Sequence, residues 1–254
     1  DILEHTDFFA PDWQKSCHWP LIKYGVIAGS EMSTNESQAE PLSSEQRGRE
    51  QLIHWLEEIL QTPLTANADI SLARLSEPNT LRETEFYYPM CSANSRTLTK
   101  LLTEHRNTAR SGDQSSNHGQ QRVHLPSYHQ LKGMMHGFID LIFQADGKFY
   151  VCDYKSSHLG NEYSDYHYQA MRDNIEKNHY DLQYLIYALA LHRHLQYSMA
   201  DYDPKQHFGG VYYLYLRGMS SDSQHQGCGV YHRAITLEEL QQLDDIFAGE
   251  QTNV

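Results

Sequence analysis

The chain has 254 residues, a length that suits one large domain or two small ones. Hydrophobic residues make up 39% and charged residues 21%, which argues against wholesale disorder. The 33 acidic residues outnumber the 20 basic ones and give a formal charge of -13, the wrong sign for a domain that holds nucleic acid by charge alone. No run of about 18 apolar residues and no charged-then-apolar leader occurs. We therefore expect a cytoplasmic globular protein, with no membrane contact, and not a freestanding DNA-binding module.

Four cysteines are spread thinly along the chain. Each lies more than 50 residues from the next, so none forms the close pairs that structural zinc and iron–sulfur sites use. An even count at such spacing predicts reduced thiols in a cytoplasmic protein. The 16 histidines are scattered mostly through polar stretches. The sequence thus predicts neither a disulfide framework nor a cysteine-bound metal.

The first half of the chain alternates predicted elements with polar segments. Apolar residues recur on one side over 45–60, which predicts an amphipathic helix. The aromatic-rich segment 83–88 predicts a strand, and 95–105 a short helix. Two stretches rich in Ser, Asn, Gln and Gly, 29–45 and 106–121, predict long loops.

The second half carries stronger signals. Two strands are expected over 137–143 and 148–155, joined into a hairpin by the turn dipeptide Asp146-Gly147. The segment 181–195 is apolar on nearly every helical face, as in a helix packed on more than one side. A further strand and a last helix, opened by a capping box, are expected over 209–216 and 236–247. Strands and helices mix throughout, which predicts an α/β or α+β class around one sheet.

The predicted hairpin carries acids where a strand would normally be apolar. Asp153 and Lys155 are two residues apart, so on a strand both side chains leave the same face. Asp140 lies on the neighbouring strand, so two carboxylates and one ammonium can converge at one end of the hairpin. Magnesium takes oxygen ligands, often one or two carboxylates with waters, and a bound metal neutralises charge on a scissile phosphate. A nearby lysine can orient the attacking water or stabilise the developing charge. These residue types fit metal-assisted phosphodiester hydrolysis.

Each of these patterns also has a structural alternative. Asp-x-Lys on a strand is most often a surface salt bridge worth under about 1 kcal/mol. The flanking segments have the composition of buried strands, however, and acids at the ends of buried strands need a stated reason. Gln183 and Tyr187 are four apart and share a helix face, where they could hydrogen-bond a phosphate or stack on a base. The alternative for this pair is a core tyrosine and an amide bonded to neighbouring backbone.

Taken together, these residues resemble the RecB-type nucleases of the PD-(D/E)XK superfamily. The order and spacing that carry the resemblance are Gly137-x-x-Asp140, Asp153-x-Lys155 and Gln183-x-x-x-Tyr187. Further matching segments are Gly137-Phe138-Ile139-Asp140-Leu141, Asp153-Tyr154-Lys155-Ser156, Leu159-Gly160, Tyr180-Asp181-Leu182-Gln183-Tyr184, 188–193, 200–203 and 207–211. The resemblance covers nearly the whole chain, strongly over 133–217. Each motif is weak alone, but their ordered succession is specific.

The resemblance implies an α/β, restriction-endonuclease-like core with a central mixed sheet flanked by helices. One domain is then expected over 1–254, with a helical lead-in, 1–82, packed on a catalytic core, 83–254. Asp140 and Asp153 would be carboxylate ligands of one magnesium ion, for which manganese or calcium can substitute. The backbone carbonyl of Tyr154 would be a further ligand.

Other roles follow from the same resemblance. Asp153 and Lys155 would be the catalytic residues, Gln183 and Tyr187 would lie along the DNA path, and Glu85 matches a family acid near the site. The family's metal-ligating histidine belongs to a Leu-Leu-His helix that precedes the residues matching Asp1-Ile2-Leu3-Glu4. We therefore expect the chain to begin just after that histidine, since neither His5 nor His18 stands at the matching position.

The implied activity is that of a magnesium-dependent exodeoxyribonuclease. It would cut DNA strands that a helicase domain unwinds when double-strand breaks are resected for recombinational repair, with RecC- and RecD-like subunits as partners. No Gly-x-x-x-x-Gly-Lys-Ser/Thr occurs, so this domain binds no nucleotide by a P-loop. The alternative is a catalytically silent docking module that acts through protein contacts, such as the loading of RecA. The presence of Asp140, Asp153 and Lys155 favours the enzyme, because a docking module would not need them.

Overall fold

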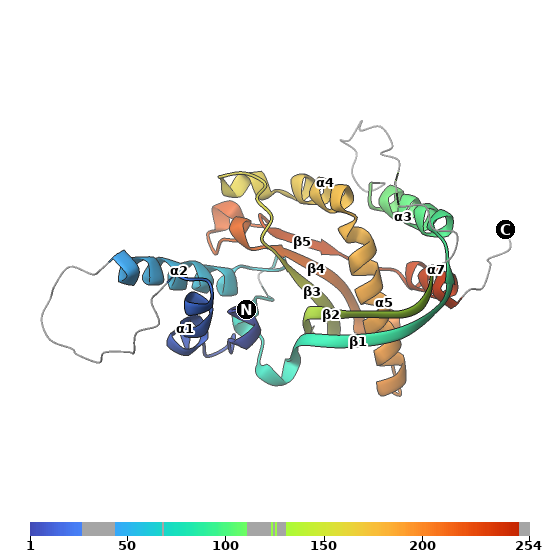
Figure 1. Ribbon diagram of the computed structural model, residues 1–254, viewed down its shortest axis with the longest axis horizontal. Helices are drawn as coiled ribbons and strands as arrows, with labels where there is room; N and C mark the ends of the chain where they lie inside the picture. The colour runs from blue at the N-terminus through green and yellow to red at the C-terminus, as the bar shows by residue number, and fades with distance from the viewer. Residues whose placement is uncertain (27–43, 68, 111–122, 124, 126–130, 249–254) are drawn as a thin grey trace, which may run out of the picture. The chain divides into compact units, whose positions relative to one another are not determined.

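The computed structural model describes residues 1–26, 44–67, 69–110, 123, 125 and 131–248. Within them the helices are α1 (Trp13–Lys23), α2 (Ser44–Gln61), α3 (Ser95–Arg110), α4 (Tyr168–Asn178), α5 (Tyr180–Ser198), α6 (Pro204–His207) and α7 (Leu237–Ala248). The strands are β1 (Thr80–Ala93), β2 (Leu131–Ala145), β3 (Lys148–Lys155), β4 (Phe208–Tyr215) and β5 (Val230–Arg233). They form one mixed sheet in the order β1-β2-β3-β4-β5 (Figure 1). The predicted α/β class is confirmed.

The chain divides into two compact units. Unit 1 comprises 1–81, 154–168 and 214–230, and unit 2 comprises 82–153, 169–213 and 231–254. Strand β3 passes from unit 2 into unit 1 after Asp153, and β4 does so after Tyr213. The first boundary, between 81 and 82, falls next to the point where the sequence separates a helical lead-in from the expected core.

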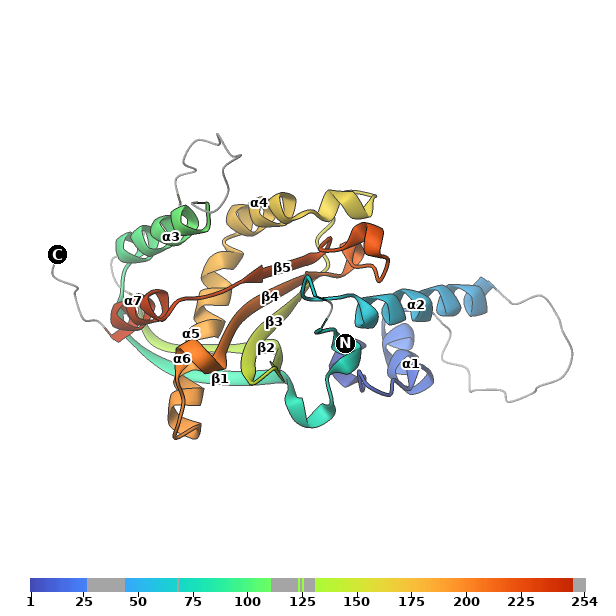
Figure 2. The same cartoon turned by 180° about the vertical axis from the view of Figure 1, so that it is seen from behind.

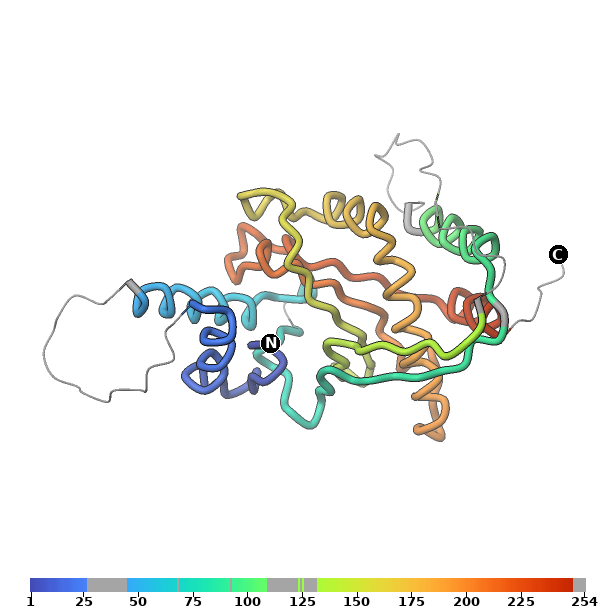
Figure 3. Tube along the Cα trace, viewed as in Figure 1, coloured from blue at the N-terminus to red at the C-terminus, as the bar shows by residue number. Residues whose placement is uncertain are grey.

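The β2–β3 hairpin carries the middle of unit 2. The two strands pair antiparallel, with Leu141 opposite Cys152 and Phe143 opposite Tyr150. The turn residues Asp146 and Gly147 both have positive φ, 50° and 75°, as a type I′ turn requires, and such a turn matches the twist of the flanking strands. Figure 3 lets the reader follow the chain as it reverses from β2 into β3. The predicted hairpin is therefore confirmed.

Helix α5 packs on the strands of unit 2 through tyrosines. The Tyr213 hydroxyl on β4 lies 2.9 Å from the carbonyl oxygen of Tyr180 and 2.9 Å from Oε1 of Gln183. The rings of Tyr184 and Tyr213 meet edge-on, with centroids 5.6 Å apart. Figure 2, seen from behind, agrees with Figure 1 that α5 lies on one face of these strands. Many side chains of α5 itself are buried, as predicted from a sequence that is apolar on nearly every face of the helix.

Buried ion pairs join the helices of unit 2. Helix α3 continues one turn beyond its predicted end at His105, and this turn carries Arg106. Arg106 makes two hydrogen bonds with the Asp181 carboxylate, from Nε at 2.5 Å and from Nη2 at 3.1 Å. His105 lies between the Glu239 carboxylate, at 2.6 Å, and the Tyr184 hydroxyl, at 2.5 Å. The residues predicted as the start of a loop, 106–110, therefore belong to a helix that packing holds in place.

Unit 1 brings its two N-terminal helices together with segments from much later in the chain. Trp13 of α1 donates from Nε1 to Oε1 of Glu57 on α2 at 3.2 Å. Backbone bonds join the later segments: the Tyr215 N–H donates to the Gly229 carbonyl at 2.8 Å, and the Gly229 N–H to the Tyr166 carbonyl at 3.0 Å. Unit 1 thus contains both local helical packing and contacts between residues far apart in sequence.

The other predicted elements can be compared directly. The strands expected over 83–88 and 209–216 and the helices expected over 45–60, 181–195 and 236–247 are present, with ends that differ by a few residues. Helices α1 and α4 and strand β5 were not predicted. The remaining parts of the predicted loops, 29–43 and 111–121, lie outside the described residues. Within the part of the chain that the structure describes, no helix has the length and apolarity needed to cross a membrane.

Candidate active site

Asp140 and Asp153 stand on neighbouring strands of unit 2. Asp140 directly precedes Leu141 and Asp153 directly follows Cys152, the last pair of the described register, so continuing the register by one residue on each strand would pair the two acids. Opposite residues on antiparallel strands send their side chains to the same face, with Cβ atoms about 4.5–5.5 Å apart. Asp153 is only 4% exposed, and Asp140 is half-buried. The hairpin thus brings the two predicted carboxylates together on one face.

Two neighbouring groups respond to the charge of this pair. Burial raises the pKa of the Cys152 thiol well above its usual range, and the charges of Asp153 and Asp140 raise it further. Burial also raises the pKa of the Tyr187 phenol; the hydrogen bond from Gln183 opposes the shift, and Asp153, Asp140 and Glu83 add to it. Negative charge is therefore concentrated at this end of the hairpin, as a cation site requires.

The donor set fits a hard divalent cation. Magnesium is usually held by one or two carboxylates and keeps several waters, so two facing aspartates suit it. Across the described ranges, no group of three or more His, Cys, Asp and Glu side chains is arranged to hold a metal ion. Asp140 and Asp153 would thus be two carboxylate donors for an ion that keeps part of its hydration shell.

Tyr154 and Lys155 follow Asp153 directly on β3 and are counted with unit 1. Lys155 is buried, with 8% of its surface exposed. A buried lysine is uncommon, because the side chain loses its hydration, so a lysine at such a position needs a chemical or structural reason. The predicted carbonyl ligand and the predicted catalytic lysine thus lie at the C-terminal end of the strand that carries Asp153.

Gln183 and Tyr187 lie one turn apart on α5 and face the same way, as predicted. Nε2 of Gln183 donates to the Tyr187 hydroxyl at 2.9 Å. The Tyr187 ring meets Phe86 of β1 edge-on, with centroids 5.7 Å apart. Phe86 in turn covers Gly137, where a Cβ atom would come within 2.9 Å of the ring. This close approach explains the glycine of the Gly137-x-x-Asp140 motif, because a side chain there would displace Phe86 from Tyr187.

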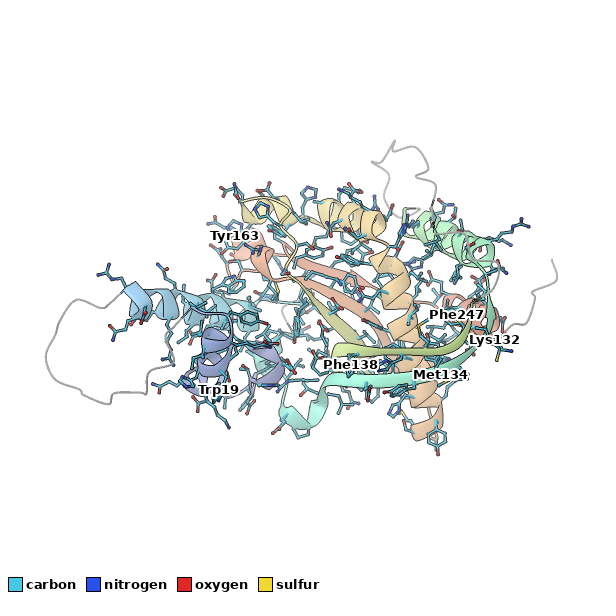
Figure 4. The ribbon with its side chains drawn as sticks, in the orientation of Figure 1. Trp19, Lys132, Met134, Phe138, Tyr163 and Phe247 are labelled. Carbon is cyan, nitrogen blue, oxygen red and sulfur yellow. The ribbon has the colours of Figure 1, made fainter. Side chains whose placement is uncertain are left out.

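Glu85 belongs to an exposed polar and aromatic cluster on β1 and β2. Its carboxylate accepts a short hydrogen bond from the Tyr87 hydroxyl and lies 2.9 Å from Nε2 of His136. These two bonds, that of Tyr87 first, lower the pKa of the Glu85 carboxyl. The His136 ring also stacks on Tyr87 and meets Phe138 edge-on, and Phe138 is labelled on β2 in Figure 4. Glu85 is thus oriented by its neighbours on the sheet surface.

Glu83 is a second acid of β1, and sequence reasoning missed it. Its charge acts on Tyr187 together with those of Asp140 and Asp153. Its backbone has φ of 45°, which non-glycine residues rarely adopt and which tends to occur at functional sites. The only signal for Glu83 in the sequence was its position two residues before Glu85, which could not show that the strand backbone departs from regular geometry there.

Comparison with known proteins establishes the class of this chain. The family model described as PD-(D/E)XK nuclease superfamily matches residues 29–251 of this chain. The chain belongs to the PD-(D/E)XK nuclease superfamily, and the resemblance predicted from its motifs is confirmed.

Relatives within this class carry one recurrent name. The chain is similar to the RecBCD enzyme subunit RecB of Haemophilus influenzae, at 38% identity over 203 residues, and of Escherichia coli strain K12, at 36% over 219 residues. These alignments cover 78% and 86% of this chain. The RecBCD enzyme subunit RecB of Mycobacterium tuberculosis strain H37Rv is 32% identical over 171 residues, or 62% of this chain. The chain spans only 15–17% of the length of these relatives.

Proposed function

We propose that this chain is the nuclease domain of a RecBCD-type helicase–nuclease. It hydrolyses phosphodiester bonds of DNA strands that the helicase unwinds, as an exodeoxyribonuclease that resects double-strand breaks for recombinational repair. The observation that carries the proposal is that Asp140 and Asp153 lie directly beyond the last described pair of one antiparallel hairpin, Leu141 and Cys152, and that Lys155 follows along β3. Membership of a nuclease superfamily and relatives named RecB support it. The partners are DNA and RecC- and RecD-like subunits, in the cytoplasm.

The hairpin acids are the groups that would hold the metal. Asp140, Asp153 and the carbonyl oxygen of Tyr154 would bind one magnesium ion, which supplies positive charge at the scissile phosphate. The ammonium of Lys155 orients the attacking water and stabilises the negative charge that develops on the phosphate oxygens. Glu85 is the further acid that the family resemblance assigns to this site.

Helix α5 contributes groups that position the strand. The Tyr187 hydroxyl accepts a bond from Gln183, so its own proton remains available to donate to a phosphate oxygen. The raised pKa of Tyr187 keeps that proton in place at neutral pH. The contact of Tyr187 with Phe86 fixes the ring orientation. Such preformed donors to phosphate fix the register of a strand without reading its sequence.

The test separates cleavage from unwinding in the full-length protein with its partner subunits. Asp153→Ala should lower DNA cleavage at least about 100-fold, because a metal carboxylate is lost, and leave ATP-driven unwinding unchanged. Asp173→Ala, at an exposed position on α4, is the matched control. A parallel loss of unwinding and cleavage would make Asp153 structural. Cleavage that persists in Asp153→Ala would overturn the catalytic role of Asp153. Absence of cleavage in the unmutated protein, together with a loss of RecA loading when the domain is altered, would favour the docking module.

A further inference from the structure

A cavity of about 500 Å³ opens in unit 1 beside the segment that follows β3. We call it the Gly160 pocket. Its lining comes from α2, from the segment after β3 and from the short turn after β4: Trp55, Ser156, His158, Gly160, Asn161, Tyr166, Leu216 and Arg217. The volume lies within the range of cavities that hold small ligands, about 300–1,000 Å³.

The pocket wall is shaped by close contacts that exclude larger side chains. The Tyr166 hydroxyl accepts from the Leu159 N–H at 3.3 Å and donates to the Gly160 carbonyl at 3.4 Å. A Cβ atom on Gly160 would lie 2.0 Å from Oδ2 of Asp165, and one on Gly218 would lie 2.2 Å from the Tyr166 ring. The Leu159-Gly160 motif, for which the acids on the hairpin provide no role, therefore serves to form this wall.

The polar side chains of the pocket include one fixed cation, the guanidinium of Arg217. Arg217 donates from Nε to the Ser156 carbonyl at 3.1 Å, which holds its guanidinium at the wall and uses one of its five N–H donors. His158 Nε2 lies 3.1 Å from Oδ1 of Asn161, which orients both side chains. Ser156, His158, Asn161 and Arg217 are all exposed to solvent. None of the eight lining residues is acidic, although the chain as a whole carries a formal charge of -13.

This combination matches the chemistry of a nucleotide. A guanidinium fork binds phosphate oxygens well, and hydroxyl and amide groups add neutral donors. The half-buried indole of Trp55 offers a flat apolar face, and bases stack on such faces with little regard for sequence. We propose that the Gly160 pocket binds one nucleotide of the substrate strand, with its phosphate on Arg217 and its base on Trp55.

The proposal rests on the proposed nuclease function and deepens it. The wall begins at Ser156, the residue that follows Lys155 in the chain. The exposed donors leave the pocket open, so a polymer can enter and leave it along the surface. A nucleotide within a DNA strand and a free nucleoside monophosphate present the same phosphate and base to the pocket. A competition measurement distinguishes these two ligands.

The test uses the complete 254-residue chain in EDTA, where cleavage does not interfere. Binding of a fluorescein-labelled oligothymidylate is followed by anisotropy at several salt concentrations. Arg217→Gln should weaken binding about 5-fold or more and reduce the slope of log K against log salt by about 0.7, the value for one phosphate contact to a single strand. Trp55→Ala should weaken binding about 5-fold or more and leave the slope unchanged, because stacking releases no counterions.

Matched controls come from the same unit. Arg74→Gln removes an exposed guanidinium and Trp19→Ala an exposed indole, labelled on α1 in Figure 4, and neither residue lines the pocket. Effects of Arg217→Gln and Trp55→Ala no larger than these controls would overturn the proposal, as would absence of oligonucleotide binding by the unmutated chain at millimolar concentration. If thymidine monophosphate displaced the labelled oligonucleotide as effectively as an unlabelled oligonucleotide does, the pocket would be a site for a free nucleotide. The proposal that it binds a nucleotide within the substrate strand would then be wrong. In each of these cases the dependence of cleavage on Asp153 would stand.

Discussion

Two groups of buried or half-buried carboxylates in unit 2 have neighbours of different charge. In the cluster of α3, α5 and α7 two buried carboxylates each accept from an arginine: Asp181 accepts two bonds from Arg106, and Glu239 accepts one from Arg233 at 3.0 Å. On the hairpin, Asp140 and Asp153 lie directly beyond the last described pair, Leu141 and Cys152, and the charges of both act on Tyr187. Like charges directly opposite on a strand pair are destabilising. Opposite charges within the helical cluster stabilise the fold, whereas like charges on the hairpin suit a site that takes up a cation.

The pKa shifts at the two places point in opposite directions. Burial alone would raise the pKa of Glu239, but the hydrogen bond and charge of His105, the Thr236 amide and the charge of Arg233 outweigh it and lower the pKa to about 2. Near the hairpin acids, by contrast, the pKa values of the neighbouring Cys152 and Tyr187 are raised. A buried acid is therefore best interpreted through the sign of the charge around it, and burial by itself does not distinguish a structural acid from a functional one.

The largest effect after the loss of Asp153 is expected at Lys155. In the full-length protein, Lys155→Gln should lower cleavage about 100-fold, because the charge that stabilises the developing phosphate negative charge is gone. Affinity for magnesium or manganese, measured by isothermal titration, should change little, because Lys155 is no metal ligand. Lys177→Gln, at an exposed position on α4, is the control. A drop in metal affinity or in unfolding midpoint that matches the loss of cleavage would give Lys155 a structural role.

In the helical cluster the expected loss is of stability. Glu239→Gln should lower the free energy of unfolding by about 3 kcal/mol at neutral pH, since each pKa unit is worth about 1.4 kcal/mol. The folded pKa, about 2, lies below the ordinary value of 4.5, so the stabilisation is fully present above pH 4.5 and is lost as the pH falls toward 2. Urea unfolding measures the difference in the free energy of unfolding between the unmutated protein and Glu239→Gln. At pH 3 this difference should be less than half of its value at pH 7.

The neighbouring glutamate supplies the control for this measurement. Glu238→Gln changes an exposed residue of the same helix turn and should leave the unfolding midpoint unchanged at both pH values. A Glu239→Gln difference that is the same at pH 7 and pH 3 would show that packing, and not charge, accounts for it. Metal-dependent cleavage at neutral pH should survive Glu239→Gln in the full-length protein, which distinguishes the helical cluster from the hairpin.

Sequence predicted those features whose physical cause is local. The turn at Asp146-Gly147 needs two residues that tolerate positive φ, and an Asp-Gly dipeptide is typical of such a turn. The capping box at the start of α7 is equally local: the Thr236 N–H donates to Glu239 at 2.8 Å, and the Glu239 N–H donates to Thr236 Oγ1 at 3.2 Å. Strand alternation likewise predicts that Asp153 and Lys155 share a face of β3, because residues two apart on a strand point the same way.

Features that depend on packing between distant segments were not visible in the sequence. Helix α1 contains Pro20 in its interior and little amphipathic character, so no helical pattern marked it, although Trp13 and Cys17 are buried. Strand β5 has four residues, too few for a periodic signal. The Gly160 pocket joins residues from α2, the segment after β3 and the turn after β4. Such sites become visible only when the fold brings their parts together.

The smallest expected effect separates the two glutamates of β1. Glu83→Gln should lower cleavage about 10-fold, because Glu83 acts on Tyr187 together with both hairpin aspartates, and the loss of a residue that orients a site through its neighbours typically costs about 10–100-fold. Glu85→Gln should cost less, since the Glu85 carboxylate is exposed and held by Tyr87 and His136. Both substitutions keep the side-chain size, so single-turnover cleavage by the full-length protein compares charge alone. A larger loss for Glu85→Gln would restore the family-based assignment of Glu85. Equal and negligible losses would confine the functional acids to Asp140 and Asp153.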